Sequence, residues 1–140
     1  FPYTTLFRSD LIIHANEALL KTAFINLLEN ACKFSPDHKA MIKILHNSNR
    51  EIDVEIKDSA QVISISEKEQ IFKPFYRSTV TNAIKGSGIG LSLVASILNE
   101  HNSGLTIKND ANKGNVFTVH FKRSQKNVLE KPVNEMNITS

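Results

Sequence analysis

Several features that would assign a protein class at once are missing from this sequence. It has a single cysteine, Cys32, which excludes an internal disulfide framework and suits a reducing compartment. No apolar run approaches membrane-spanning length and no signal peptide is recognisable, so we expect a soluble, cytoplasmic stretch of chain without direct membrane contact. The net charge of +3 is spread along the chain, and no run of Lys and Arg is interleaved with aromatics, which argues against nucleic-acid binding.

The common glycine-rich nucleotide motifs are missing too. The turn GSGIG at 86–90 is not the dinucleotide fingerprint GxGxxG, because Leu91 stands where the third glycine would be. No GxxxxGK[ST] P-loop occurs anywhere. The five histidines show no metal-ligand spacing, and no internal repeat is visible.

What the chain does have is enough apolar residues for one globular domain, since 41% of its 140 residues are hydrophobic. Residues 1–9 (FPYTTLFRS) match the translation of a common short-read sequencing adapter, so we exclude them from fold reasoning. The alternative is a natural N-terminal segment. We therefore expect one domain over residues 10–123, truncated at its N-terminus, and a flexible polar tail over 124–140.

Hydrophobic periodicity predicts a long helix, capped by Asn16 and running to about Phe34. On a second face of this helix, Asn26, Asn30 and Lys33 fall at positions i, i+4 and i+7 and are neighbours. A solvated stripe is the ordinary explanation, but two asparagines inside a helix are poor helix formers and favour a functional one. We expect Cys32, in the same helix, to be a small core residue.

The remaining periodic segments predict a two-layer α/β sandwich, in which a mixed sheet of about five strands carries about three helices on one face. A capping box at Ser66–Glu69 begins a short helix through Phe72, and Pro74 breaks it. A third helix follows the glycine turn, from about Ile89 to Glu100. The expected strands are 10–15, 40–46, 51–58, 105–109 and 115–122.

Asp58 falls on the apolar side of its strand, because it has the parity of Ile52, Val54 and Ile56. A buried carboxylate is costly unless it meets hydrogen-bond donors. Either the strand ends before Asp58, which then caps a loop, or the carboxylate awaits a ligand that can donate. The sequence alone leaves both alternatives open.

Two further segments point to a phosphate-binding site. The glycine turn at 86–90 opens a helix, and unpaired amides at a helix N-terminus attract anions. Before it, the aromatic turn FKPFYR at 72–77 ends in Arg77, and residues 78–85 form a loop. The asparagine helix adds amide oxygens for a metal and an ammonium for phosphate charge.

In this order, the asparagine helix, the inward aspartate, the aromatic turn and the glycine turn resemble the ATP-binding domain of sensor histidine kinases. That domain belongs to the Bergerat-fold group, with the gyrase, heat-shock-90 and mismatch-repair ATPases. The resemblance runs from about residue 10 to residue 122. NLLENACKFSP (26–36) resembles the N box, KPFYR (73–77) the F box, and GSGIGLSLV (86–94) the second glycine box.

The resemblance implies a role for each matching residue. Asn30 would bind Mg²⁺ beside Asn26, Lys33 would contact phosphate, and Phe34 would pack near the nucleotide. Asp58 would accept from the adenine amine, next to Ala60. Arg77 and Lys85 would reach the terminal phosphate from the lid between them. Gly86, Gly88 and Gly90 would let this lid close and the backbone approach the phosphates. Supporting positions would be Phe72, Phe75 and Leu91.

Position 26 separates the subclasses of this group. Its ATPases generally place a Glu there to activate water, whereas Asn26 cannot act as a base. The resemblance therefore implies a phosphotransferase that holds ATP and presents it to a histidine supplied by a dimerisation domain, in a two-component phosphorelay with a response regulator. None of the five histidines here has the setting of a phosphoacceptor. The parent protein of such a domain can be anchored in the inner membrane.

The chain departs from the family pattern in its first glycine box, where Ala60 and Val62 replace the glycines of Asp-x-Gly-x-Gly. Val62 in particular resists the positive φ that glycine permits. Milder departures are Asn102-Ser103-Gly104 and Asn115, which stands where Thr is common. Two alternatives thus remain beside the kinase module: a degenerate module that acts through protein contacts, and a gyrase-like ATPase, which Asn26 disfavours.

Overall fold

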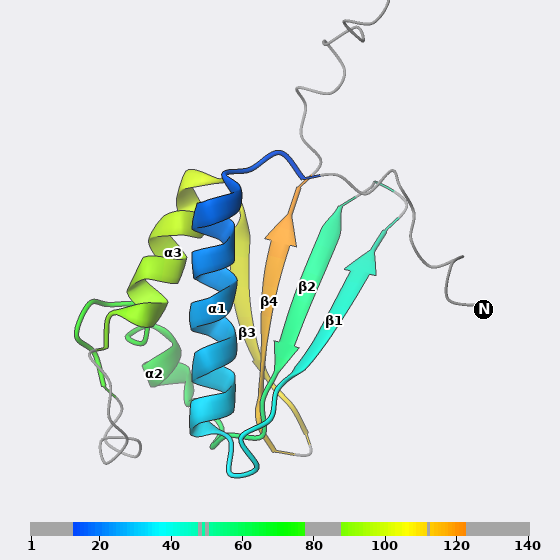
Figure 1. Cartoon of the computed structure of the whole chain (residues 1–140). Coiled ribbons are helices and arrows are strands. Elements are labelled where there is room, and N and C mark those ends of the chain that lie inside the picture. Colours follow the sequence, from blue (N-terminus) through cyan, green and yellow to red (C-terminus); the bar gives the residue numbers. More distant parts are fainter. Residues whose placement is uncertain (1–12, 48, 50, 78–87, 112, 123–140) are drawn as a thin grey trace, which may run out of the picture.

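A computed structural model describes residues 13–47, 49, 51–77, 88–111 and 113–122. Across these residues, a four-stranded sheet in the order β1-β2-β4-β3 has its helices on one face (Figure 1). The elements are α1 (Glu17–Phe34), β1 (Met41–His46), β2 (Ile52–Lys57), α2 (Ile65–Lys68), α3 (Gly90–Glu100), β3 (Gly104–Asn109) and β4 (Asn115–Phe121). The expected two-layer α/β sandwich with three helices is confirmed.

The sheet differs from the expected mixed sheet of about five strands. Within the described residues it has four strands, and each pairing between neighbours is antiparallel. Alternation of apolar residues fixes which face of a strand is buried but not the direction of its neighbour, which explains the error. Of the strand expected at 10–15, residues 13–15 are not in a strand, and 10–12 lie outside the described part.

Helix α1 begins and ends as the sequence predicts. The Asn16 side chain accepts a hydrogen bond from the Leu19 amide at 3.1 Å, which satisfies one of the free N–H groups at the helix start. Ser35 follows the last helical residue in an extended conformation and is 1% exposed. Among the described residues, no helix is long and apolar enough to cross a membrane.

Helix α2 is shorter than expected and begins at a different cap. Its capping box pairs Ser64 with Glu67, rather than Ser66 with Glu69. The Ser64 side chain accepts from the Glu67 amide, and the Glu67 carboxylate accepts from the Ser64 amide at 3.0 Å. The helix ends at Lys68 and does not run through Phe72.

The core lies between the inner face of the sheet and helices α1 and α3. Cys32 lies outside it and is only partly buried, contrary to expectation, because the inward stripe of α1 passes through its neighbour Ala31. The inward side chains alternate along β2 and β4 and recur every turn or so on the helices. They are Ala23, Leu27 and Ala31 of α1, Val94, Ile97 and Leu98 of α3, Ile52, Val54 and Ile56 of β2, and Phe117, Val119 and Phe121 of β4.

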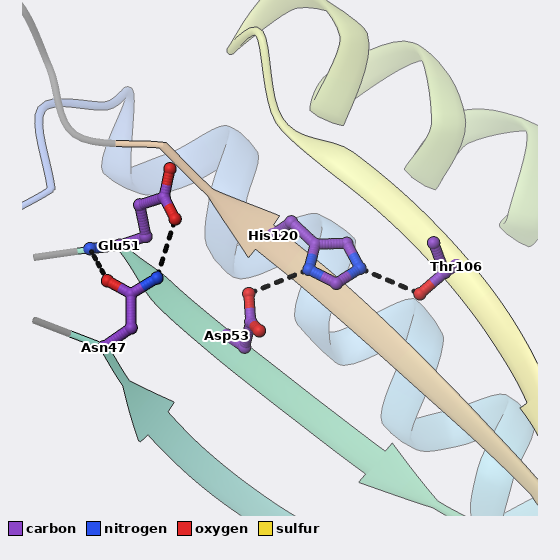
Figure 2. Close-up of polar contacts among 5 residues, drawn as sticks. All are labelled: Asn47, Glu51, Asp53, Thr106 and His120. Atoms are coloured by element: carbon purple, nitrogen blue, oxygen red, sulfur yellow. Dashed lines mark hydrogen bonds and ion pairs between the residues drawn. The ribbon is translucent and has the colours of Figure 1, made fainter. Parts of the chain in front are cut away.

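The other face of the sheet carries polar side chains that tie its strands together (Figure 2). His120 on β4 contacts Asp53 of β2 through Nδ1 at 2.8 Å and Thr106 of β3 through Nε2 at 2.8 Å. At the turn between β1 and β2, the Asn47 amide donates to the Glu51 carboxylate at 2.7 Å. With this face polar, the apolar interior and any site buried in it lie on the helical side.

Candidate functional site

A cavity of about 320 Å³ opens on the helical side of the molecule. Its walls come from α1, from the segment that follows β2, from the region of α2 and from the start of α3. Ten of the residues predicted for the site line it: Asn26, Asn30, Lys33, Phe34, Asp58, Ala60, Arg77, Gly88, Gly90 and Leu91. The other two, Lys85 and Gly86, lie outside the described residues.

The two asparagines of α1 meet the first residue of α3. A Cβ atom added to Gly90 would lie 2.9 Å from Asn26 Oδ1 and 3.9 Å from Asn30 Nδ2. Asn26 is held in place because its Nδ2 donates to the Thr22 carbonyl at 2.8 Å. The Asn30 side chain makes no hydrogen bond to the described part of the chain and remains available to a ligand. Glycine at position 90 therefore makes the room in which both amides face the cavity.

The start of α3 offers backbone amides to the same place. Its N-cap residue, Ile89, makes no side-chain hydrogen bond to the first turn. The first N–H groups of an α-helix have no partner inside the helix, and the helix dipole places positive charge there. The end of the cavity beside Gly90 therefore suits an anion.

The glycine turn is fitted tightly onto the aromatic turn that precedes it. Gly88 has a φ of +72°, and an added Cβ would lie 2.8 Å from the Tyr76 carbonyl oxygen. The Phe75 amide donates to the Gly88 carbonyl at 3.0 Å. The Phe75 ring itself is 73% exposed, so this residue supports the site through its backbone and not through its side chain.

Lys33 and Phe34 close the last turn of α1. The Lys33 ammonium lies 5.2 Å from the centre of the Phe34 ring, within the range of a cation–π contact. Both residues line the cavity. A cation held over an aromatic ring at this place can neutralise negative charge on a bound molecule.

The sequence left open whether Asp58 caps a loop after its strand or is a buried carboxylate available to a ligand, and the structure combines the two. The strand ends at Lys57, and the Asp58 carboxylate turns back to accept from the Ala60 amide at 3.0 Å. It nevertheless stays buried, at 7% exposure, and also accepts from the backbone amide and the side chain of Asn115 at 2.9 and 3.0 Å. All three of these bonds end on Oδ1. Protein donors thus satisfy one oxygen of a carboxylate that lines the cavity.

The segment after Asp58 does not need the glycines it lacks. Neither Ala60 nor Val62 has a positive φ. Ala60 is 7% exposed and Val62 40% exposed, and both line the cavity. Side chains hold the segment instead: the Ser59 amide donates to Ser35 Oγ at 3.0 Å, and the Ser59 hydroxyl donates to Asp37 at 2.9 Å. The latter bond is the main reason why the pKa of Asp37 lies below its usual 3.8.

Sequence reasoning missed Asn115, which is 1% exposed and lines the cavity beside Asp58. The signal was present, because Asn115 shares the parity of the buried Phe117 and Val119, as Asp58 shares that of Ile56. The other lining residues that were not predicted are Leu27, Glu29, Ala31, Gln61, Val62, Ile63, Glu67, Ile71, Tyr76 and Phe117.

The side-chain amide oxygens in the cavity suit a hard cation that takes its remaining ligands from water and phosphate. Within the described residues, no group of three or more His, Cys, Asp or Glu side chains could hold a metal ion. Mg²⁺ in nucleotide sites is commonly bound by one or two protein oxygens, with water and phosphate supplying the rest. The amide oxygens of Asn26 and Asn30, beside an anion-binding helix start, fit that arrangement.

Comparisons with known proteins concern the family and the fold. The family described as "Histidine kinase-, DNA gyrase B-, and HSP90-like ATPase" matches residues 15–125. The adaptive-response sensory kinase SasA of Gloeothece citriformis is 30% identical over 110 residues, which are 78% of this chain and 28% of that protein. The heme sensor protein HssS of Staphylococcus saprophyticus is 33% identical over 117 residues, covering 83% of this chain and 25% of that protein. The chain thus spans about a quarter of the length of these relatives.

Solved structures share the fold. The catalytic domain of histidine kinase ThkA, in a nucleotide-free form, superposes with a TM-score of 0.68 at 26% identity, covering 82% of this chain and 73% of that one. The mycobacterial sensor histidine kinase MprB superposes with a TM-score of 0.69 at 24% identity, covering 78% of this chain and 73% of that one.

Proposed function

Because this chain belongs to the family of histidine kinase-, DNA gyrase B- and HSP90-like ATPases, we propose that its cavity binds ATP together with Mg²⁺. The observation that carries the proposal is the spacing of two contacts along α1, one with the segment of Asp58 and one with the start of α3. Ser35, at its end, holds the segment of Asp58, whereas Asn26 lies beside Gly90. Asn26 and Ser35 are nine residues apart, which corresponds to about 13 Å along a helix. This length suits the distance from a nucleotide base to its phosphates.

In this proposal, the base lies at Asp58. The carboxylate accepts a hydrogen bond from the exocyclic amine of adenine, and the methyl group of Ala60 contacts the ring. Such a donor has an oxygen to bind, because only one oxygen of the carboxylate has protein partners among the described residues. Phe34 packs beside the nucleotide.

The phosphates lie at the other end, where the chain provides positive charge and metal ligands. Asn30 binds Mg²⁺ with Asn26 beside it, and the bound ion neutralises phosphate charge. The amides at the start of α3 contact the phosphates. Lys33 starts from the last turn of α1, where its ammonium lies over the Phe34 ring, and its long side chain turns toward the phosphates when the nucleotide binds. Arg77 reaches the terminal phosphate, as does Lys85, which lies outside the described residues. Gly86, also outside them, lets the backbone approach the phosphates.

Phosphoryl transfer to another protein segment suits this site better than hydrolysis. Asn26 occupies the position from which a carboxylate would activate water, and an amide cannot act as a general base. The site then contributes positioning and charge neutralisation. We propose that the domain, over residues 10–123, is the cytoplasmic catalytic module of a two-component sensor histidine kinase. The acceptor histidine lies on a dimerisation domain, and a response regulator receives the phosphoryl group.

Calorimetric titration of ATP into the 140-residue chain, with and without Mg²⁺, tests the proposal. We expect Mg²⁺-dependent binding that is lost in Asn30→Ala and kept in Asn99→Ala, which makes the same change on the exposed face of α3. If the folded chain, checked by circular dichroism, binds no ATP, the substituted glycine box favours the second candidate: a degenerate module that acts through protein contacts.

A further inference from the structure

The Asn115 side chain makes three hydrogen bonds beside the cavity. Its amide nitrogen donates to Asp58 Oδ1 at 3.0 Å and to the Gln61 carbonyl at 3.1 Å. Its amide oxygen accepts from the Ile63 backbone amide at 2.9 Å. The side chain is 1% exposed, so water cannot replace these partners. One residue of β4 therefore contacts three positions of the segment that follows β2.

The orientation of this amide is fixed by its partners. The Ile63 N–H can only donate, so the amide oxygen must face it. The NH₂ group then faces Asp58 and the Gln61 carbonyl, which accept. Since each partner is complementary to one end of the amide, Asn115 cannot rotate without losing all of these bonds.

The backbone of Asn115 acts on Asp58 in the same direction. Its N–H donates to Asp58 Oδ1 at 2.9 Å, and its carbonyl accepts from the Asp58 amide at 3.0 Å. The preceding Gly114 permits this contact, because an added Cβ would lie 2.0 Å from the Asp58 carbonyl oxygen. Oδ1 is thereby turned toward β4, and Oδ2 is the oxygen left for a ligand.

We propose that Asn115 is a positioning residue for base recognition, acting through Asp58 and resting on the function proposed above. It aims Asp58 Oδ2 at the amino group of the base. It also holds residues 61 and 63 on either side of Val62, so the segment keeps one conformation without glycine. An amide is suited to this task because it carries a donor and an acceptor on one planar group.

The test compares ADP with IDP, whose base carries an oxygen in place of the amino group. The unmodified chain prefers ADP, because the Asp58 carboxylate attracts the amine and repels the oxygen. In Asn115→Asp the size is kept, but a carboxylate oxygen replaces the NH₂ group that faces Asp58. We expect the ADP-to-IDP affinity ratio to fall by about tenfold or more, since a charge-assisted hydrogen bond is lost.

Three further variants separate positioning from a merely structural role. Ser35→Ala removes the tie to Ser59 without touching Asp58, so both nucleotides weaken equally and the ratio stays. Asn115→Thr keeps a donor near Asp58 and retains most of the ratio even where stability falls. Asn99→Asp makes the matched chemical change on the exposed face of α3 and alters neither quantity.

The outcomes distinguish the two proposals. A chain that discriminates ADP from IDP equally well with and without Asn115 overturns the role of Asn115 and leaves the proposed function standing. A ratio that falls as far in Ser35→Ala as in Asn115→Asp does the same, since the effect is then one of loop stability. A folded chain that binds neither nucleotide overturns both proposals.

Discussion

Gly90 keeps a space that a single methyl group would fill. Its absent Cβ would lie 2.9 Å from Asn26 Oδ1, and that amide is anchored to the Thr22 carbonyl on its other side. The residue therefore matters for the arrangement of the site and not for the helix, where alanine is the better former. Affinity and stability should respond to its substitution in opposite directions.

We predict that Gly90→Ala lowers the affinity for Mg²⁺-ATP by about tenfold, equivalent to about 1.4 kcal/mol, while the free energy of unfolding is unchanged or higher. Calorimetry and urea denaturation measure the two quantities. Gly104→Ala is the control, because its Cβ would meet His120 at an ordinary 3.5 Å. Equal loss of stability and affinity in Gly90→Ala would show that the methyl group disturbs the fold instead.

The Asp37 carboxylate gives the site a pH dependence with a definite sign. Its pKa is lowered chiefly by the hydrogen bond from the Ser59 hydroxyl. A lowered pKa stabilises the fold above the ordinary value of 3.8, and that stabilisation is lost as the pH falls through the lowered value. The tie between Asp37 and the segment of Asp58 is thus intact at neutral pH.

We predict that Ser59→Ala raises the pKa of Asp37 toward 3.8, as followed by NMR titration of the side-chain carboxyl. Ser59→Thr keeps the hydroxyl and should leave the pKa low. The stability difference between Ser59→Ala and the unmodified chain should shrink as the pH falls below 3.8 and be smallest below the lowered pKa of the unmodified chain, where the carboxylate is protonated in both. A pKa that is the same in all three proteins would mean that the hydroxyl does not bond Asp37 in solution.

At the scale of elements, the start of β4 and the end of β2 form one unit. The Asp58 amide donates to the Asn115 carbonyl, the backbone and side-chain N–H groups of Asn115 donate to Asp58 Oδ1, and Gly114 lies against the Asp58 carbonyl. The turn before β4 therefore sets where the segment that we propose to bind the base lies. Disturbing it should cost stability and binding together, unlike the change at Gly90.

We predict that Gly114→Ala lowers the free energy of unfolding by roughly 2–4 kcal/mol, because the φ of +105° and the clash with backbone both oppose a Cβ. Urea denaturation provides the measurement. Gly104→Ala, on β3, should change stability by no more than about 1 kcal/mol. Similar values for the two variants would contradict the tight packing of the turn on Asp58.

Sequence patterns predicted which helices and strands exist better than they predicted which of two similar motifs begins an element. Ser64 and Ser66 both have a glutamate three positions later, so the motif alone could not choose between them as the cap of α2. The helix begins at the earlier one. Period-two parity placed Asp58 inside, and the same rule applied to Asn115 would have found its partner. The short connections between β1 and β2 and between β3 and β4 allow only antiparallel pairs, so this part of the direction was readable from the sequence. The pairing of β2 with β4 joins distant segments and has no local signature.

At the scale of the whole molecule, the helices in the described part of the chain leave the edge strand β1 uncovered. Ile42 and Ile44 of β1 pair in register with the buried Ile56 and Val54 of β2 and share their inward face. They are nevertheless 51% and 64% exposed, since β1 lies beyond the reach of α1 (Figure 1). An apolar surface of this kind on an edge strand favours association between copies.

We predict that the 140-residue chain associates as its concentration rises, and that Ile44→Lys reduces this association. A charge on the edge strand opposes the pairing of one sheet with another, while little burial is lost at a side chain that is already 64% exposed. Light scattering over a concentration series measures the effect. Ile65→Lys makes the same change at an 81% exposed position on α2 and should leave the association as it was. If both variants behave like the unmodified chain, β1 is not the surface through which copies meet. The domain then tolerates the exposure of Ile42 and Ile44 without associating through them.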